Sequence, residues 1–360
     1  MVFVVKVAPG LQLYPGSSGL RANLGRRRAD LVQVGRQFAS NATTGVPLTF
    51  YAFPGPPPTM PTYQAPTIPP DAPKVQQAER LAAAIDGILK LHHQNFPPIQ
   101  KAVLLPPPSP DYPAILRRRT SDALSRVSIF RRSTRKAAKA AAVRATQMEC
   151  DELARSRQTQ HNAVNHEIDQ LWRRLISNDP DVVLAVLSNI LTANAEAVVP
   201  IGVWDSEAHL AAHMPDPETL PDRHPTTTAA GNVSLKKFTK AEGADLYKQL
   251  VAGLLLTTTK QAFAVAPSLR TIRMVALRKS PHNAFGHDRR EALLAASFTR
   301  DRLNGVRWRA ADAGTILQGI SDELLIRTAG PSKTLAPLDL KTEPYIARLL
   351  DAANSAPGQF

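Results

Sequence analysis

The sequence has little cysteine, few aromatic residues and no long apolar run. Among 360 residues there is one cysteine, Cys150, and only 6% are Phe, Trp or Tyr. A single cysteine excludes an internal disulfide and a cysteine-rich zinc site, and it suits the reducing cytoplasm. The longest apolar run, residues 250–256, is too short to span a bilayer. We therefore expect a cytoplasmic protein without a membrane span.

Sequence motifs of common catalytic and cofactor sites are also missing. There is no Gly-Lys-Ser/Thr phosphate loop and no Gly-x-Ser-x-Gly nucleophile motif. Residues 1–8 lack the basic segment and longer apolar segment of a signal peptide. The sequence predicts no cofactor, no metal ligand set and no catalytic residue. This favours a non-enzymatic protein, although it does not decide the question.

Positive charge is what the sequence has in excess. It holds 44 Lys and Arg against 30 Asp and Glu, a formal net charge of +14. Such an excess favours polyanionic partners, with nucleic acid first and an anionic membrane surface second. The alternative is that Arg, together with abundant Ala and Pro, reflects a genome rich in G and C. Both explanations stay open at this point.

Most of the excess lies in one segment, residues 112–148, which has a single acid, Asp122. Its ten cations are our candidate nucleic-acid-binding residues: Arg117, Arg118, Arg119, Arg126, Arg131, Arg132, Arg135, Lys136, Lys139 and Arg144. A helical pattern continues to about residue 178, so we expect one long basic helix. It could lie against phosphates, or its charges could simply be solvated. Phe130 is the only aromatic residue near them, which does not support base stacking.

Residues 236–298 predict the core of a C-terminal domain. A helix is expected over 239–264, with Thr239 as N-cap and Glu242 completing a capping box. Strands are expected over 270–278 and 293–298, and the first has apolar residues on both faces, as in the interior of a sheet. Further elements follow from local patterns: helices over 74–91, 179–194, 310–319 and 343–354, strands over 197–204, 208–214 and 323–328, and a loop over 215–231.

The first 53 residues read as short strands separated by glycine turns. The repeated motifs are Pro9-Gly10-Leu11, Leu13, Ser18-Gly19-Leu20, Gly25, Val34-Gly35 and Thr44-Gly45-Val46-Pro47. In these motifs the segment resembles a small domain of unknown function found at the N-terminus of many bacterial proteins. It departs from that pattern at Tyr14, Gly16 and Leu48. The resemblance implies a β module that could dock protein partners, and it implies no chemistry.

Longer, actinobacterial members of that family resemble the rest of the chain. The matching segments are Asn95-Phe-Pro-Pro98, Asp179-Pro-Asp-Val182, Thr239-Lys-Ala-Glu242 with Tyr247, and residues 262–267. The expected fold is therefore a multidomain α+β or α/β chain. We expect a β module over 1–53, a linker with nine prolines over 54–73, a helical region over 74–178, and an α/β domain with a mixed sheet over 179–360.

Two other kinds of site were weighed. His209 and His213 would share one face if they lay on a helix, but on the expected strand they are about 13 Å apart and cannot hold one ion. A metal-dependent nuclease or other hydrolase in the α/β domain is the main alternative function; its candidate residues are Asp205, Glu207, Asp216, Lys236 and Lys237. A third hypothesis has docking modules at both ends, joined by a tether, with the basic helix merely solvated. The oligomeric state is not predicted.

Overall fold

The computed structural model describes residues 5–8, 11–16, 19–24, 50–53, 63, 73–191, 198–229, 231–280, 290–341, 343–344 and 346–347. The chain forms two compact units. The first unit comprises Met1–Val7, Gln12–Ala52 and Lys101–Trp172, and the second comprises Ala8–Leu11, Phe53–Gln100 and Arg173–Phe360. The structure is of the expected mixed α and β class. Residues 74–100 belong with the second unit, which differs from the domain boundaries at 74 and 178 that the sequence suggested.

Three strands near the N-terminus form a small sheet in the order β1-β2-β3. They are β1 (Val5–Ala8), β2 (Leu11–Gly16) and β3 (Gly19–Leu24). These strands agree with the prediction of short strands separated by glycine turns. Residues 25–49 of the expected β module lie outside the described residues.

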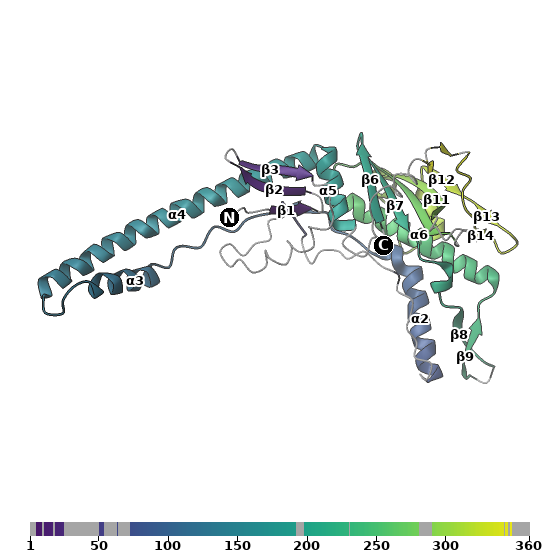
Figure 1. Cartoon of the computed structure of the whole chain (residues 1–360). Helices are drawn as coiled ribbons and strands as arrows, with labels where there is room; N and C mark the ends of the chain where they lie inside the picture. The colour runs from purple at the N-terminus through teal and green to yellow at the C-terminus, as the bar shows by residue number, and fades with distance from the viewer. Residues whose placement is uncertain are drawn as a thin grey trace, which may run out of the picture. The chain divides into compact units, whose positions relative to one another are not determined.

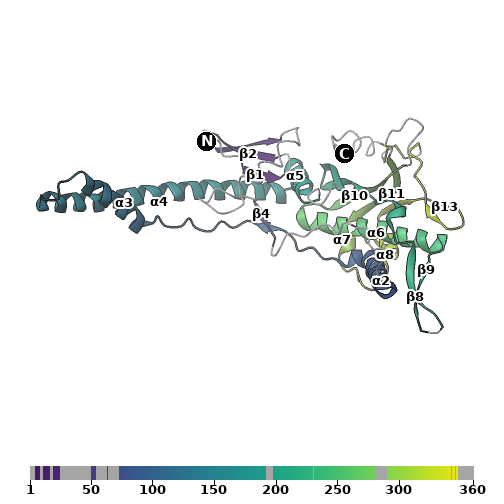
Figure 2. The same ribbon diagram turned by 60° about the horizontal axis from the view of Figure 1, so that its bottom comes forward.

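The basic segment that begins at residue 112 forms two helices where the sequence predicted one. Helix α3 (Tyr112–Ser125) and helix α4 (Arg132–Ile176) are separated by residues 126–131 and lie side by side (Figures 1 and 2). The expected long helix is confirmed by α4, but the first part of the basic segment forms the separate helix α3. The intervening residues, Arg-Val-Ser-Ile-Phe-Arg, include Val, Ser and Ile, which are weaker helix formers than the Ala, Lys and Arg that follow. We call α3, α4 and the turn between them the hairpin.

The hairpin begins and closes at defined contacts. The Asp111 carboxylate caps α3 by accepting a hydrogen bond from the backbone N–H of Ala114 at 3.0 Å. Ala142, Thr146 and Cys150 are buried at intervals of four residues on α4, which places them on one side of the helix. Near the base, the ammonium of Lys101 pairs with the carboxylate of Asp169 at 2.8 Å.

The second unit is built on a five-stranded mixed sheet in the order β12-β11-β10-β7-β6. Its strands are β6 (Val198–Trp204), β7 (Glu207–His213), β10 (Thr271–Lys279), β11 (Arg290–Thr299) and β12 (Glu323–Ile326). The pairing of β7 with β10 is parallel and the other pairings are antiparallel. The predicted interior strand is confirmed, since β10 lies at the centre of the sheet.

One face of this sheet is covered by α6 (Lys240–Val265). Thr239 and Glu242 form the expected capping box, and Leu250, Leu255 and Leu256 are fully buried. The hydroxyl of Thr259 donates to the sulfur of Met274 at 3.1 Å, which places Met274 of β10 on the α6 side. Helices α2 (Lys74–Lys90), α5 (Pro180–Leu191) and α8 (Ala313–Ile320) pack around α6 (Figure 2).

The opposite face of the sheet has an apolar end and a polar end. Ala211, Val275, Leu277, Ala292 and Ala295 form a buried cluster with Ile346, and Leu338 and Leu340 pack against it. The segment after β14 (Thr334–Leu335) thus covers the apolar end. Most of the closing helix expected over 343–354 lies outside the described residues.

Two other expectations need correction. The expected loop over 215–231 contains a short 3-10 helix, η2 (Pro217–Thr219), and strand β8 (Arg223–Thr227), which pairs with β9 (Val233–Lys237). The threonines that suggested a loop are also good strand formers. On α2, the apolar row Leu81, Ile85, Ile88 and Leu89 predicts one buried face; Leu81 and Ile88 are buried, but Leu89 is 41% exposed.

The remaining elements are short connections and edge strands: β4 (Tyr51–Ala52), β5 (Gln100–Lys101), η1 (Leu91–His93), α7 (Arg300–Leu303) and β13 (Thr328–Ala329). In the part of the chain that the structure describes, no helix combines the length and the apolar character that crossing a bilayer requires.

Candidate polyanion interface

The ten candidate cations come from three consecutive parts of the hairpin. Arg117, Arg118 and Arg119 lie on α3, Arg126 and Arg131 lie in the turn region, and Arg132, Arg135, Lys136, Lys139 and Arg144 lie on α4. All are exposed except Arg135, which is half-buried. The sequence placed these residues on a single helix, whereas the structure folds them onto two neighbouring helices.

Two of these arginines share one counter-charge within the hairpin. The carboxylate of Glu149 on α4 pairs with the guanidinium groups of Arg118 and Arg119 on α3, and Arg119 Nε lies 2.7 Å from Glu149 Oε2. Hydrogen bonds from Arg119 and Arg118 lower the pKa of Glu149. Glu149 stands just past the segment counted as basic, so a count extended by a few residues would have included this counter-charge.

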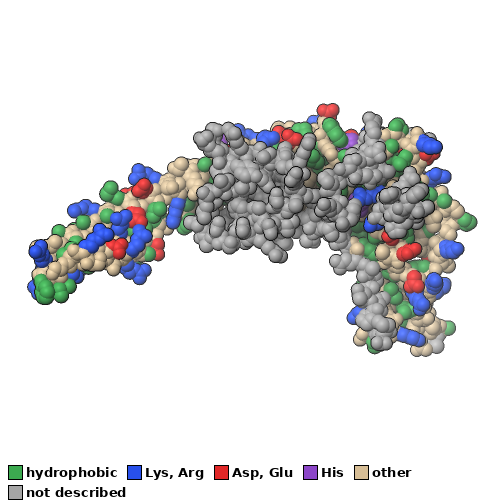
Figure 3. Space-filling model, viewed as in Figure 1, with side chains coloured by type: hydrophobic (Ala, Val, Ile, Leu, Met, Phe, Trp, Pro, Cys, Tyr) green, Lys and Arg blue, Asp and Glu red, His purple; other side chains and the backbone are tan. Residues whose placement is uncertain are grey.

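Seven candidate cations keep their charge available. Within the described residues, no ion pair is formed by Arg117, Arg126, Arg131, Arg132, Lys136, Lys139 or Arg144. On a regular helix, Arg132, Lys136 and Lys139 fall within an arc of about 60°. Figure 3 shows Lys and Arg side chains along both edges and across the visible face of the hairpin, with acids between them. On this face the cations are interspersed with acids and other side chains and do not form one continuous patch.

The turn between α3 and α4 presents apolar side chains to solvent. Ile129 is 71% exposed and Phe130 is 87% exposed, with Arg126 and Arg131 beside them in the chain. We call Ile129 and Phe130 the hairpin tip. Figure 3 shows hydrophobic and basic side chains together at this end. The sequence identified Phe130 as an isolated aromatic residue, but its position at the end of a hairpin depends on the helix break.

A second polar cluster lies on the face of the sheet away from α6. The carboxylate of Glu207 lies 2.9 Å from Nε2 of His209 and 2.7 Å from Nε of Arg273, and Arg273 Nη1 reaches Glu323 at 2.8 Å. Burial lowers the pKa of His209, and the charge of Glu207 opposes that shift. These residues meet because His209 and Arg273 are paired across β7 and β10.

The proposed nuclease residues are distributed over different elements. Asp205 lies in the turn before β7 and Glu207 begins this strand, while Asp216 follows its far end, about 20 Å away along an extended chain. Lys236 and Lys237 lie on β9. His209 and His213 both lie on β7, so the expected strand geometry is confirmed. In the described part of the chain, no three or more His, Cys, Asp or Glu residues are grouped so that they could hold a metal.

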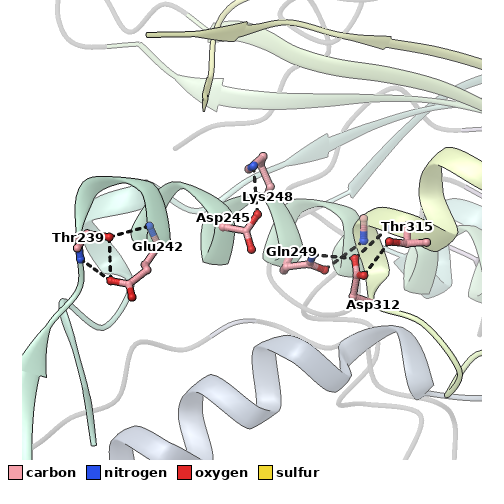
Figure 4. A network of polar contacts seen from close by, with 8 residues as sticks. Thr239, Glu242, Asp245, Lys248, Gln249, Asp312 and Thr315 are labelled. Carbon is pink, nitrogen blue, oxygen red and sulfur yellow. Dashed lines mark hydrogen bonds and ion pairs between the residues drawn. The ribbon is translucent and has the colours of Figure 1, made fainter. Parts of the chain in front are cut away.

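A cavity of about 340 Å³ lies between α6, α8 and the edge of the sheet. Its polar groups bond mainly to one another (Figure 4). Lys248 pairs with Asp245 at 3.1 Å, and the Asp312 carboxylate accepts hydrogen bonds from Gln249 Nε2 at 2.8 Å and from Thr315 Oγ1 at 2.7 Å. These and the N–H of Thr315 lower the pKa of Asp312 to about 2. This network caps α8 and joins it to α6, which is a structural role.

Comparison with protein-family models, curated proteins and solved structures gives no match to this chain. The assignment of a function therefore depends on the geometry of the described residues.

Proposed function

We propose that the chain is a non-enzymatic, cytoplasmic protein that binds nucleic acid through the phosphate contacts of its hairpin. The observation that supports this is the set of seven exposed cations without an ion-pair partner among the described residues. Lys and Arg at such positions replace condensed counterions on nucleic acid, and their release favours binding at low salt.

The arrangement of the cations suits a phosphate backbone. From Arg132 to Arg144, α4 rises about 18 Å, which is the length of about five base pairs. Lys and Arg side chains spread along the hairpin can contact phosphates whatever the bases are. This favours binding that does not depend on the nucleotide sequence. Phe130 adds one exposed ring on which an unpaired base could stack.

An anionic membrane is the competing partner. An apolar tip beside arginines is also suited to a lipid interface. Nucleic acid is favoured because Lys136, Lys139 and Arg144 lie one to three turns beyond the start of α4 and extend the charge well away from the tip. Docking of protein partners through the N-terminal β module remains a separate proposal, based on the family resemblance alone.

The test compares two variants of equal charge. In the hairpin variant, Arg131, Arg132, Lys136 and Lys139 are replaced by Gln. In the control variant, four exposed cations of the second unit are replaced by Gln: Lys237, Lys240, Arg327 and Lys341. Binding to a labelled duplex and to a single-stranded RNA is measured by fluorescence anisotropy at several salt concentrations.

We expect the hairpin variant to bind at least tenfold more weakly at low salt than the control variant. For duplex DNA, a plot of log K against the logarithm of the salt concentration should have a slope shallower by up to about 3.6, because up to four phosphate contacts are lost. Equal affinities of the two variants would overturn the proposal. So would a wild-type chain that binds anionic vesicles but neither nucleic acid.

A further inference from the structure

A second basic surface lies in the second unit, around Trp308. A hollow of about 480 Å³ is lined by His93, Asn95, Arg307, Trp308, Arg309 and Ala310. It is built from two distant parts of the chain, the end of η1 with the residues after it and the loop that follows α7. None of the lining residues is acidic. Its volume is within the range of small-molecule sites.

Lys260 of α6 adjoins this hollow and forms no ion pair with an acid in the described part of the chain. Its ammonium donates to the carbonyl oxygen of His92 at 3.1 Å and to the Asn95 side-chain oxygen at 3.2 Å, and it lies 4.1 Å from the centre of the Trp308 ring. All three partners are neutral. Burial lowers the pKa of Lys260 to about 8. A half-buried ammonium held only by dipoles and a ring would gain from a nearby anion.

The histidines behind Trp308 are also without acidic partners. His92 is 1% exposed, and its Nε2 lies 3.2 Å from the carbonyl oxygen of Ala311. Its Nδ1 has no hydrogen-bond partner in the described part of the chain. The rings of His92 and His93 are in edge contact, 4.4 Å between centres. Burial lowers the pKa of His92, and the charges of His93 and Lys260 add to this shift, while hydrogen bonding to backbone carbonyl groups opposes it.

The acid that follows this loop in the sequence is already engaged. Asp312 follows this loop directly, but its carboxylate accepts hydrogen bonds from Gln249 and Thr315. Arg307 and Arg309 are exposed and form no ion pair within the described residues. If Lys260 only held Trp308 in position, that structural role would not explain why two exposed arginines flank the ring.

We propose that the hollow binds a small phosphate-bearing ligand with a flat ring, of the nucleoside phosphate class. The phosphates would contact Lys260, Arg307 and Arg309, and the ring would pack against Trp308. Arginine and lysine are the usual phosphate donors, and tryptophan is a stacking surface for a base. The inference does not depend on the hairpin, which carries none of these residues.

The experiment uses the full chain and follows tryptophan fluorescence and heat on addition of ADP, inorganic pyrophosphate or adenosine. The test variant carries Arg307→Gln and Arg309→Gln, and the charge-matched control carries Lys237→Gln and Arg327→Gln. A third variant, Trp308→Phe, tests the ring contact. Thermal unfolding of each variant establishes that it is folded.

We expect ADP to bind the wild-type chain, and the test variant to bind it at least tenfold more weakly than the control. Trp308→Phe should weaken ADP binding more than pyrophosphate binding. The hairpin variant described above should bind ADP like wild type, so the two proposals fail independently. Absence of binding of both ADP and pyrophosphate, or equal affinities of test and control variants, would overturn the inference. So would binding of a short oligonucleotide at this site with no binding of free ADP.

Discussion

The indole ring of Trp204 occupies the space beside Gly202 where any other residue would place its Cβ atom. A Cβ built on Gly202 would lie 2.4 Å from Cη2 of Trp204, closer than real contacts allow. Both residues lie on β6, and the same ring makes an edge contact with His209, 4.5 Å between centres. The missing side chain at position 202 therefore lets Trp204 cover the histidine of the polar cluster.

Replacing Gly202 by Ala should move the ring away from His209. Trp204 is 54% exposed, so its ring can swing outward and the loss of stability should be modest, about 1 kcal/mol. With less cover, the pKa of His209 should rise toward its ordinary value, as measured by NMR titration. Gly87→Ala on α2 is the control, because its Cβ meets nothing within 4 Å and should stabilise the helix by about 0.5–1 kcal/mol. An unchanged His209 titration in Gly202→Ala would contradict this account.

Replacing Glu149 by Gln should strengthen nucleic-acid binding. The change releases Arg118 and Arg119 from their shared carboxylate, and the loss of these exposed ion pairs should have little effect on stability. Asp151→Asn is the matched control, since it removes the same charge on the same helix, and the Asp151 carboxylate accepts a hydrogen bond from Gln147 while only its backbone carbonyl accepts one from Arg155. A larger gain in affinity for Glu149→Gln in anisotropy titrations supports local release. Equal gains would mean that only net charge matters.

Acid should destabilise the second unit through His213. Burial and the charges of Arg290 and Lys279 lower its pKa to about 4, and Arg290 Nη1 lies 3.5 Å from Nε2 of the ring. Between pH 6.5 and about 4 the unfolded chain takes up a proton that the folded chain resists, so stability falls as pH falls through this range. In His213→Gln, the free energy of unfolding should fall by about 1–2 kcal/mol less than in the wild-type chain over this pH range. The effect is of this size because the ring is only partly buried and solvent screens part of the interaction.

Urea unfolding at pH 7 and at pH 4.5, followed by tryptophan fluorescence, measures this effect. His224→Gln is a suitable comparison, because His224 lies on the separate β8–β9 pair. If both variants lose as much stability on acidification as the wild-type chain, the role assigned to His213 is wrong.

Replacing Asp312 by Ala should destabilise α8 by about 1 kcal/mol at pH 7, the usual effect of losing an N-cap. The folded-state pKa of about 2 lies below the ordinary value of 3.8, so this stabilisation is present above pH 4 and is lost as pH falls toward 2. Thermal unfolding at pH 7 and pH 2 measures both effects. Asp245→Ala, which breaks only a surface pair with Lys248, should cost less than about 0.5 kcal/mol. A cost for Asp312→Ala no larger than this would argue against the cap.

Local patterns in the sequence predicted much of the second unit. Thr239 and Glu242 identified the start of α6, and apolar residues on both faces of 270–278 identified the central strand. These signals are strong because capping and alternation act over a few residues. The break between α3 and α4 was missed because its residues disfavour a helix only weakly, while the flanking residues favour one.

The candidate sites were harder to predict, because they depend on residues that are distant in sequence. Nothing near Lys260 in the sequence indicates Trp308 or His92, which become its neighbours only after α2, η1 and the loop after α7 pack on α6. In the same way, Glu149 pairs with Arg118 and Arg119 only because the chain reverses direction between α3 and α4.

The pairing of Lys101 with Asp169 has a consequence for how this chain can change over evolutionary time. The polypeptide leaves toward α3 and returns along α4 at two positions that one ion pair connects. Residues 102–168 therefore form an extension whose two ends are joined by this ion pair. Matched helical turns added to or removed from both α3 and α4 would change the length of the hairpin. Such a change would leave the Lys101–Asp169 pair in place.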